Sequence, residues 1–260
     1  MQTKVIVMGA QGRMGNTIAR LAQEDSQLEL AGVVEKEDRL AGLESWQCQA
    51  GSDLKPILES NNDGVVIDFT FPETSMDTAR KCSQTGGAAV IGTTGFSSEQ
   101  LQELEKLAQN TRLFWAPNMS VGINVLIQLL PELLKCLGDK YDVEIMEMHH
   151  RFKKDAPSGT AVKLAQILAE TRGQDLDKSG VYARQGMIGE RNQEEIGVQT
   201  LRGGDVVGEH TFYFLGFGER VEVTHRAHSR ETFAQGALRA AKWLGTQPPG
   251  KLYAMADIFA

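Results

Sequence analysis

The densest run of titratable side chains lies at residues 147–160, with the sequence EMHHRFKKDAPSGT. His149 and His150 carry imidazoles that exchange a proton near neutral pH, and Lys153 and Lys154 add positive charge suited to a carboxylate ligand. A regular strand would point two adjacent histidines to opposite faces, so they share a site only if the chain leaves its strand there. These residue types indicate general acid–base chemistry beside a cationic wall.

The end of the same run opens a helix that we predict over residues 158–170. Ser158, Gly159 and Thr160 offer hydroxyls and free backbone N–H groups, which favour an anion at a helix start. Ser158 is the expected N-cap, and alanine at position 161 prevents a reciprocal capping box. Each feature alone fits an ordinary structural role. Together they predict a site for a carboxylate-bearing substrate.

A second cluster lies near the N-terminus, where Gly9, Gly12 and Gly15 follow a short apolar run and precede a helical stretch. Glycines let the backbone turn tightly and approach a pyrophosphate, whose charge a helix start favours. Glu35 lies 20 residues after Gly15, at the end of the next apolar run. An acid at that place accepts hydrogen bonds from the adenosine ribose, so the spacing predicts a dinucleotide site.

Lys36, the residue after Glu35, does not decide whether the cofactor is NADH or NADPH. Glu35 disfavours the 2′-phosphate of NADPH by repulsion, whereas the ammonium of Lys36 neutralises such a phosphate if it lies close enough. Lys36 is equally well explained as a solvated surface charge. We therefore expect NADH and/or NADPH, with a KM difference of less than about tenfold.

The predicted secondary structure that positions these residues changes near residue 120. Before it, short runs that are apolar on both faces alternate with amphipathic stretches, which predicts a doubly wound, Rossmann-type α/β domain with a parallel sheet. Thr70–Glu73 and Ser97–Gln100 fit capping boxes at two helix starts. The predicted strands are residues 4–8, 28–34, 64–69, 88–91 and 113–116.

After residue 120 strands predominate, which predicts an α+β domain with a mixed or antiparallel sheet. Alternation over residues 141–149 places Val143, Ile145 and Glu147 on one face. The turn at Gly203–Asp205 resembles a hairpin. Further strands are expected at 197–202, 210–215 and 220–224, and helices at 121–137, where Pro131 should bend or restart the helix, and at 231–244.

We thus expect a dinucleotide-binding domain over residues 1–120, with 236–260 packing back on it. Residues 121–235 are then the substrate-binding and oligomerisation domain.

Composition excludes several classes of protein. Lys and Arg number 27 against 34 Asp and Glu, a net charge of −7 that argues against a nucleic-acid partner. Three widely spaced cysteines suit a reducing compartment, and no apolar run reaches the ~18 residues of a membrane span. The histidines outside the 147–160 run have no H-E-x-x-H or cysteine partner, so we expect no metal. We predict a cytoplasmic protein without signal peptide or membrane partner.

Seven segments spread over almost the whole chain resemble the dihydrodipicolinate reductase family. The resemblance implies NAD(P)H-dependent reduction of 4-hydroxy-tetrahydrodipicolinate to tetrahydrodipicolinate in lysine and diaminopimelate biosynthesis. It also implies a homotetramer with its C-terminal sheets packed together. The segment EMHHRFKKDAPSGTA is the most specific, and the others are VIVMGAQGRMG, DFTFPE, VIGTTGF, APNMSVGINV, RGGDVVGEHTF and ERVEVTHRAHSRETFAQGA.

The resemblance also assigns roles to residues. His149 corresponds to the family's proton donor/acceptor and Lys153 to a second proton donor, and which one gives the crucial proton stays open. His150, with Ser158, Gly159 and Thr160, would hold the carboxylates of a cyclic dicarboxylate substrate. Family members often carry arginine where this chain has Lys36. The implied cofactor residues are Gly9, Ala10, Gln11, Gly12, Arg13, Met14, Glu35, Lys36, Gly92, Thr93, Thr94, Ala116, Pro117, Asn118 and Met119.

Three other interpretations remain. A homoserine- or inositol-type dehydrogenase would share the first domain but needs another substrate cluster. An NAD-sensing regulator needs a DNA-reading helix, which the acidic composition disfavours. A catalytically dead scaffold is disfavoured by the presence of both His149 and Lys153.

Overall fold

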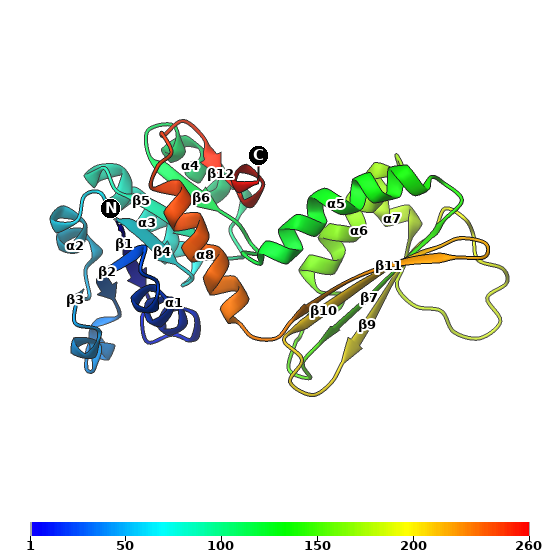
Figure 1. The fold of residues 1–260 in the computed structure, drawn as a ribbon, viewed down its shortest axis with the longest axis horizontal. Helices are drawn as coiled ribbons and strands as arrows, with labels where there is room; N and C mark the ends of the chain where they lie inside the picture. Colours follow the sequence, from blue (N-terminus) through cyan, green and yellow to red (C-terminus); the bar gives the residue numbers. More distant parts are fainter. Residues whose placement is uncertain (1, 260) are drawn as a thin grey trace. The chain divides into compact units, whose positions relative to one another are not determined.

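The computed structural model describes residues 2–259, and the chain forms two compact units (Figure 1). One unit comprises Met1–Val121 and Glu231–Ala260, and the other comprises Gly122–Arg230. The chain therefore leaves the first unit once and returns to it through its last long helix, α8 (Glu231–Leu244).

The first unit is built on a seven-stranded sheet with the order β12-β6-β5-β4-β1-β2-β3. Every pairing in it is parallel, and the order reverses direction at β1 and β4, as in a doubly wound fold. The Rossmann-type prediction is confirmed. The strands are β1 (Thr3–Met8), β2 (Leu28–Val34), β3 (Gln49–Gly51), β4 (Val65–Asp68), β5 (Ala88–Ile91), β6 (Arg112–Trp115) and β12 (Leu252–Tyr253).

The apolar strands are buried on both faces because helices cover both. On one face Val5, Val7 and Phe114 pack with α1 (Arg13–Glu24) and α8. On the other face Ile6 and Val66 pack with the remaining three helices. Those helices are α2 (Leu54–Ser60), α3 (Pro72–Thr85) and α4 (Ser98–Ala108).

The two predicted capping boxes have different outcomes. At α4 the Ser97 hydroxyl accepts from the N–H of Gln100, and the Gln100 side chain accepts from the N–H of Ser97, so that box is confirmed. The prediction of a capping box at Thr70 is wrong. Helix α3 begins one residue later than it requires, at Pro72, and Thr70 instead donates its N–H and hydroxyl to the carboxylate of Asp68.

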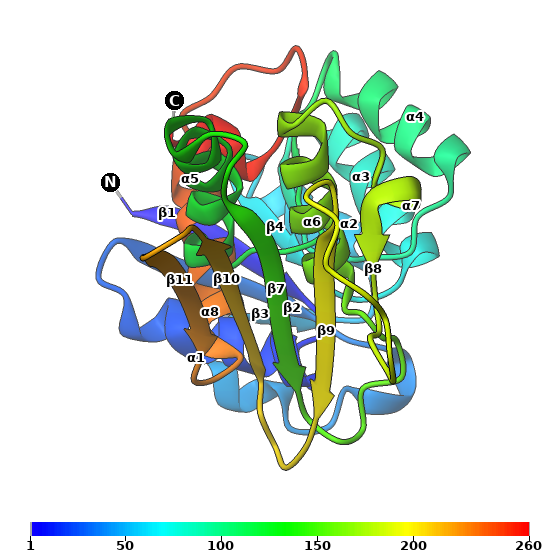
Figure 2. The ribbon, with the colours of Figure 1, turned by 90° about the vertical axis from the view of Figure 1, so that its right-hand side faces the viewer.

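The second unit holds a five-stranded mixed sheet with the order β11-β10-β7-β9-β8. The alternation predicted for the central strand is confirmed, since Val143, Ile145 and Glu147 are completely buried. Two long helices, α5 (Val121–Leu137) and α6 (Gly159–Thr171), cover one face of the sheet (Figure 2). The other elements are β7 (Asp142–His149), α7 (Leu176–Ser179), β8 (Gly180–Val181), β9 (Ile196–Arg202), β10 (Gly208–Leu215) and β11 (Arg220–Ala227).

Of the two effects predicted for Pro131, a restart does not occur, because Pro131 lies inside the single helix α5 with Leu130 and Leu134 buried in the same core on either side; a bend stays a prediction. One expectation about this unit is wrong. The turn at Gly203–Asp205 is not a hairpin, because β7 lies between β9 and β10, antiparallel to β10 and parallel to β9. The segment crosses the end of β7 instead, and the actual hairpin joins β10 to β11.

The elements missing from the sequence prediction are short. Strands of two or three residues, such as β3, β8 and β12, contain too few positions to show a period of two. The same holds for α7 and for three 3₁₀ turns, which are η1 (Glu37–Arg39), η2 (Leu43–Trp46) and η3 (Met255–Ile258).

Candidate functional site

The glycine turn in the first unit has no room for side chains. Gly9 follows β1 with a φ of +64°, and the N–H of Gly12 donates to its carbonyl at 2.8 Å. A Cβ at Gly15 would lie 2.1 Å from that same carbonyl oxygen. Gly12 is the N-cap of α1 and makes no side-chain cap hydrogen bond, so N–H groups at the helix start stay available to an anion.

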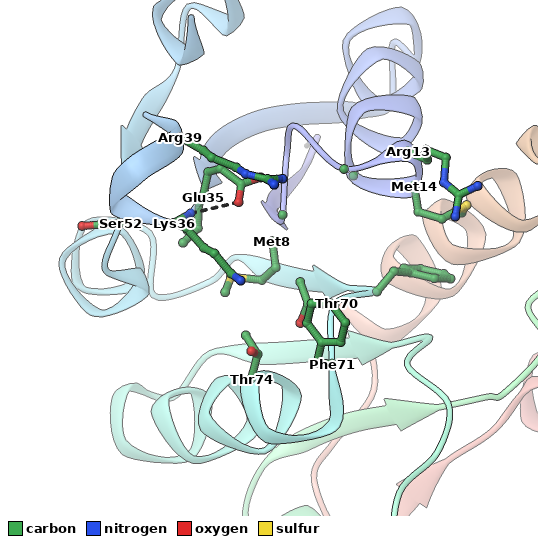
Figure 3. Close-up of a pocket in the computed structure, with 15 residues that line it drawn as sticks. Met8, Arg13, Met14, Glu35, Lys36, Arg39, Ser52, Thr70, Phe71 and Thr74 are labelled. Carbon is green, nitrogen blue, oxygen red and sulfur yellow. Dashed lines mark hydrogen bonds between the residues drawn. The ribbon is translucent and has the colours of Figure 1, made fainter. Parts of the chain in front are cut away.

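A cavity of about 470 Å³ opens beside this turn (Figure 3). Six of the predicted cofactor residues line it: Gly9, Gly12, Arg13, Met14, Glu35 and Lys36. Ala10 and Gln11 belong to the same turn but lie outside the lining. The lining also includes Gly15 of the predicted glycine turn, and eight residues that sequence reasoning did not assign to it: Met8, Val34, Arg39, Ser52, Phe69, Thr70, Phe71 and Thr74.

Glu35 ties the end of β2 to the glycine turn. Its carboxylate accepts from the N–H of Gln11 at 3.0 Å and from the N–H of Lys36 at 2.9 Å, and the residue is 8% exposed. These bonds hold the acid in one orientation at the cavity wall. A carboxylate so placed suits the ribose hydroxyls of a dinucleotide.

Two cations line the cavity near this acid. Figure 3 shows Lys36 extending toward Thr70, and Arg39 lying beside Glu35. The Lys36 ammonium lies 5.8 Å from the centre of the Phe71 ring, which is a cation–π distance. The sequence did not predict Arg39 as a residue of this cavity, because it belongs to η1, a 3₁₀ turn without a periodic pattern. The available signal was a second basic residue four positions after Glu35.

The loops after β5 and β6 lie at the carboxyl edge of the sheet but not in the cavity lining. A Cβ at Gly92 would lie 2.2 Å from the Phe69 ring, so this glycine admits the ring. Thr93 is buried, shares a 2.7 Å hydrogen bond with Ser75 and accepts from the Trp115 indole at 3.1 Å. Of the other predicted positions here, Ala116 and Met119 are buried, Thr94 and Pro117 are exposed and Asn118 is half-buried.

The polar cluster of the second unit centres on Glu147, which has no exposed surface. Its carboxylate lies 2.6 Å from Nδ1 of His149 and accepts two hydrogen bonds of 2.9 Å from the Arg202 guanidinium. It also accepts from the N–H of Ser158 at 2.9 Å. One buried acid therefore connects the end of β7 with β9 and with the start of α6.

Neighbouring groups and burial shift the pKa values of Glu147 and His149. Burial favours the neutral form of Glu147, but Arg202, His149 and the Ser158 N–H outweigh it and hold the pKa of the carboxyl below its usual range. Burial lowers the pKa of His149, and the charge of Glu147 opposes that lowering. His210, 4% exposed, packs edge-on against His149, and burial lowers its pKa to about 3.

The chain leaves the sheet directly after His149, as expected from the adjacent histidines. The N–H of Lys153 donates to the carbonyl of His150 in the following turn, and the Lys153 ammonium pairs with Asp155 at 2.9 Å. The Nδ1 atom of His150 is buried without a hydrogen-bond partner. The turn thus places His150 and Lys153 next to the end of the strand that carries His149.

Helix α6 begins as expected, with Ser158 as its N-cap. The Ser158 hydroxyl accepts from the N–H of Ala161 at 3.2 Å, and no reciprocal box forms. Apart from its chain neighbours and the backbone of its own helix turn, no described residue has a heavy atom within 4 Å of where a Cβ at Gly159 would lie, so space is open beside the first turn. The predicted substrate residues His150, Ser158, Gly159 and Thr160 thus lie along the turn and the helix start that follow β7.

Three residues of this cluster were given no role by sequence reasoning: Glu147, Arg202 and His210. Glu147 and His149 lie two positions apart on one strand face, and that alternation was the available signal. Arg202 and His210 come from strands whose order the sequence did not reveal.

Among residues 2–259, no three or more histidine, cysteine, aspartate or glutamate side chains are grouped so that they could hold a metal ion. Over the same range, no helix combines the length and the apolar character needed to cross a membrane.

Comparisons with known proteins cover the whole chain. A family model described as "Dihydrodipicolinate reductase, N-terminus" matches residues 3–119, and one described as "Dihydrodipicolinate reductase, C-terminus" matches residues 122–259. A 4-hydroxy-tetrahydrodipicolinate reductase of Nitratidesulfovibrio vulgaris (strain DP4) is 63% identical over 100% of both chains. The protein of the same name from Desulfovibrio desulfuricans is 53% identical over 100% of both chains.

Solved structures agree with this relationship. A dipicolinate-bound dihydrodipicolinate reductase from Paenisporosarcina sp. TG-14 has a TM-score of 0.79 at 27% identity, covering 98% of each chain. A probable dehydrogenase from Thermotoga maritima has a TM-score of 0.61 at 13% identity, covering 98% of this chain and 92% of its own, and shares the fold.

Proposed function

The chain belongs to the dihydrodipicolinate reductase family, and we propose that it reduces 4-hydroxy-tetrahydrodipicolinate to tetrahydrodipicolinate with NADH or NADPH. This reaction is a step of lysine and diaminopimelate biosynthesis. The observation that carries the proposal is the contact of the buried Glu147 with the half-buried His149, beside the cationic turn and the start of α6. The other unit of the chain holds a dinucleotide-type glycine turn.

The cavity of the first unit fits a dinucleotide. The cavity beside Gly9 and Gly12 is proposed for the pyrophosphate because it borders the N-terminus of α1, and Glu35, held by the N–H of Gln11, is proposed for the adenosine ribose. Lys36 and Arg39 supply positive charge for a 2′-phosphate. Gly92–Thr94 and Ala116–Met119 are proposed for the nicotinamide half, because ligands of such sheets bind beyond the carboxyl ends of the strands.

The net reaction replaces the C4 hydroxyl of the substrate by hydrogen, with loss of water and uptake of a hydride and a proton. NADH or NADPH, when bound, would supply the hydride for C4 of the ring, which is unsaturated once the C4 hydroxyl has left as water. The chain supplies the proton to the resulting enamine, and His149 and Lys153 are the proposed donors. Their positive charge also stabilises negative charge that develops on the ring and its carboxylates.

The substrate's two carboxylates need donors around a ring. We assign them to the imidazole of His150 and to the first turn of α6, where Gly159 and Thr160 supply backbone N–H groups and Ser158 and Thr160 supply hydroxyls, while the N–H of Ser158 donates to Glu147. The open space beside Gly159 and the unpartnered Nδ1 of His150 support this assignment. We divide the protein accordingly into a dinucleotide-binding unit and a unit for substrate binding and oligomerisation.

We also propose a cytoplasmic homotetramer. The free thiols of Cys48, Cys82 and Cys136 suit a reducing compartment. Assembly through the sheet of the second unit is supported by apolar side chains on its outer face, such as the 39% exposed Leu201. Light scattering would then give four times the chain mass of 28.5 kDa, and a monomer mass would refute the assembly.

The activity is tested with the purified protein and freshly prepared 4-hydroxy-tetrahydrodipicolinate. Oxidation of NADPH or NADH is expected only when this compound is present, and neither homoserine nor inositol is expected to reduce NAD+ or NADP+. Cofactor oxidation that is independent of the diacid, or reduction of NAD+ or NADP+ by one of the two alcohols, would overturn the assignment.

A further inference from the structure

Three residues other than His149 donate hydrogen bonds to the buried carboxylate of Glu147. Arg202 donates twice, Ser158 donates its N–H, and the hydroxyl of Thr200 lies 3.2 Å from Oε1. These groups hold the acid ionised, because together they lower its pKa against the effect of burial. An ionised carboxylate only accepts hydrogen bonds, so the 2.6 Å contact requires a proton on Nδ1 of His149.

We infer that Glu147 is a positioning residue for proton transfer. It binds the Nδ1–H of His149 and thereby leaves Nε2 as the ring atom that exchanges a proton with the substrate. This inference rests on the proposed function, because it assigns Glu147 a part in the same proton transfer. Glu147 is fully buried and acts only through His149.

The strand opposite keeps the Nε2 side of the ring clear. Gly208, at the start of β10, comes directly before Glu209, which pairs with Met148 of β7. A Cβ at this glycine would lie 3.0 Å from Nε2 of His149, closer than nine in ten real Cβ contacts. The two ring nitrogens therefore have different surroundings: a carboxylate at Nδ1, and a residue without a side chain beside Nε2.

Four charged or titratable groups face His149, and one of them is negative. Glu147 lies on the same strand, Arg202 comes from β9, Lys153 from the turn after β7, and His210 from β10. Lys153 is itself paired with Asp155, and His210 is neutral above a pH of about 3. Replacing Glu147 by a neutral amide removes the carboxylate that contacts His149 and leaves Arg202 and Lys153 in place, which lowers the pKa of His149 further.

A merely structural role for Glu147 has a different signature. In that case the acid only anchors Arg202 and the start of α6, and its loss disturbs the fold without changing which nitrogen of His149 holds the proton. The strand offers a matched control in Glu144, on the opposite face of β7, which pairs with Arg184 and Arg191. Glu144 is also a carboxylate held by guanidinium groups.

The first test is ¹⁵N NMR of the histidine side chains over a pH series, with His149 assigned by its absence in His149→Asn. The wild type is expected to carry the neutral-ring proton on Nδ1. Glu147→Gln is expected to lower the pKa of His149 and to populate the Nε2–H tautomer, whereas Glu144→Gln leaves both unchanged. A wild-type ring protonated on Nε2 overturns the inference even if Glu147→Gln does not fold, and so does an unchanged His149 in a folded variant.

The second test is a double-mutant cycle on turnover with Glu147→Gln and His149→Asn. Glu147→Gln alone is expected to lower kcat about 10–100-fold and to leave the KM for NADPH unchanged, since the cofactor cavity belongs to the other unit. In the His149→Asn background it should change kcat less than about twofold, because an effect exerted through His149 is then already lost. Equal losses in both backgrounds overturn the inference.

The two tests separate this inference from the activity. If the wild type does not reduce the diacid, the proposed function fails, and the NMR series still decides whether Glu147 sets the protonation of His149. If the wild type is active and the NMR series shows no coupling, the inference alone fails.

Discussion

Arg39 offers a sharp test of cofactor recognition, because it lines the cavity beside the ribose acid and belongs to no predicted element. We consider Arg39→Gln, which removes one positive charge and keeps a side chain of similar polarity. Lys36 stays in place as the second cation. The change is expected to weaken the binding of NADPH and to leave the binding of NADH nearly unaffected, because only NADPH carries the 2′-phosphate.

The magnitude follows from the exposure of the site. Arg39 is exposed, so its attraction to a unit charge about 5 Å away is close to the value in water, about 0.8 kcal/mol. A phosphate monoester carries a charge of about −1.5 to −2 near pH 7, which raises the loss to about 1.5 kcal/mol. This corresponds to about a tenfold increase in the Kd of NADPH.

Calorimetric titration of the wild type and the variant with both cofactors measures this directly. The Kd of NADPH should rise about tenfold in Arg39→Gln, while the Kd of NADH stays within about twofold. Lys55→Gln is the matched control: it removes an exposed cation that pairs with Glu59 and lies outside the cavity lining, and it should change neither constant. The NADPH effect should shrink with added salt.

An equal rise in the Kd of both cofactors would show that Arg39 acts on the fold or on the pyrophosphate. No effect on either would show that Lys36 alone faces the phosphate. Both results would refute the reasoning from the cavity.

Three further outcomes are expected. Lys153→Ala should lower kcat at least ~100-fold with its melting temperature retained, and near wild-type turnover would remove Lys153 from the mechanism. Gly236→Ala should lower the free energy of unfolding by more than ~2 kcal/mol in denaturant titrations, because its Cβ would lie 1.7 Å from the carbonyl oxygen of Met119; Gly203→Ala, where no atom lies within 4 Å, should be nearly neutral. The lowered pKa of Glu147 stabilises the fold above its usual value of 4.5, and that contribution is lost as the pH falls through the lower folded value. Glu147→Gln should therefore flatten the acid limb of the stability curve, and an unchanged limb would contradict the ion-pair argument.

The first sheet could be predicted from sequence because its strands are buried on both faces and so carry continuous apolar runs such as VIVM and AAVI. The glycine spacing revealed the turn for a similar reason. A Cβ at Gly15 collides with the backbone of Gly9, so the local geometry demands glycine.

The order of strands in the second sheet could not be predicted in this way. A glycine-rich segment between two strands is compatible with a hairpin or with a crossing, and β7 lies between β9 and β10 because its buried face completes the core under α5 and α6. That order also brings Arg202 and His210 to Glu147. Their part in the site was therefore hidden from sequence reasoning. The two-residue spacing of Glu147 and His149 on one strand was visible in the sequence but was not used.

The central claim is that this chain delivers a hydride to C4 of a cyclic diacid. Turnover with NADPH deuterated at both C4 positions, followed by mass spectrometry of the product, tests it most directly. The account predicts one deuterium per molecule of tetrahydrodipicolinate, located at C4 and formed in proportion to the cofactor oxidised. Unlabelled product, or cofactor oxidation without labelled product, would contradict it.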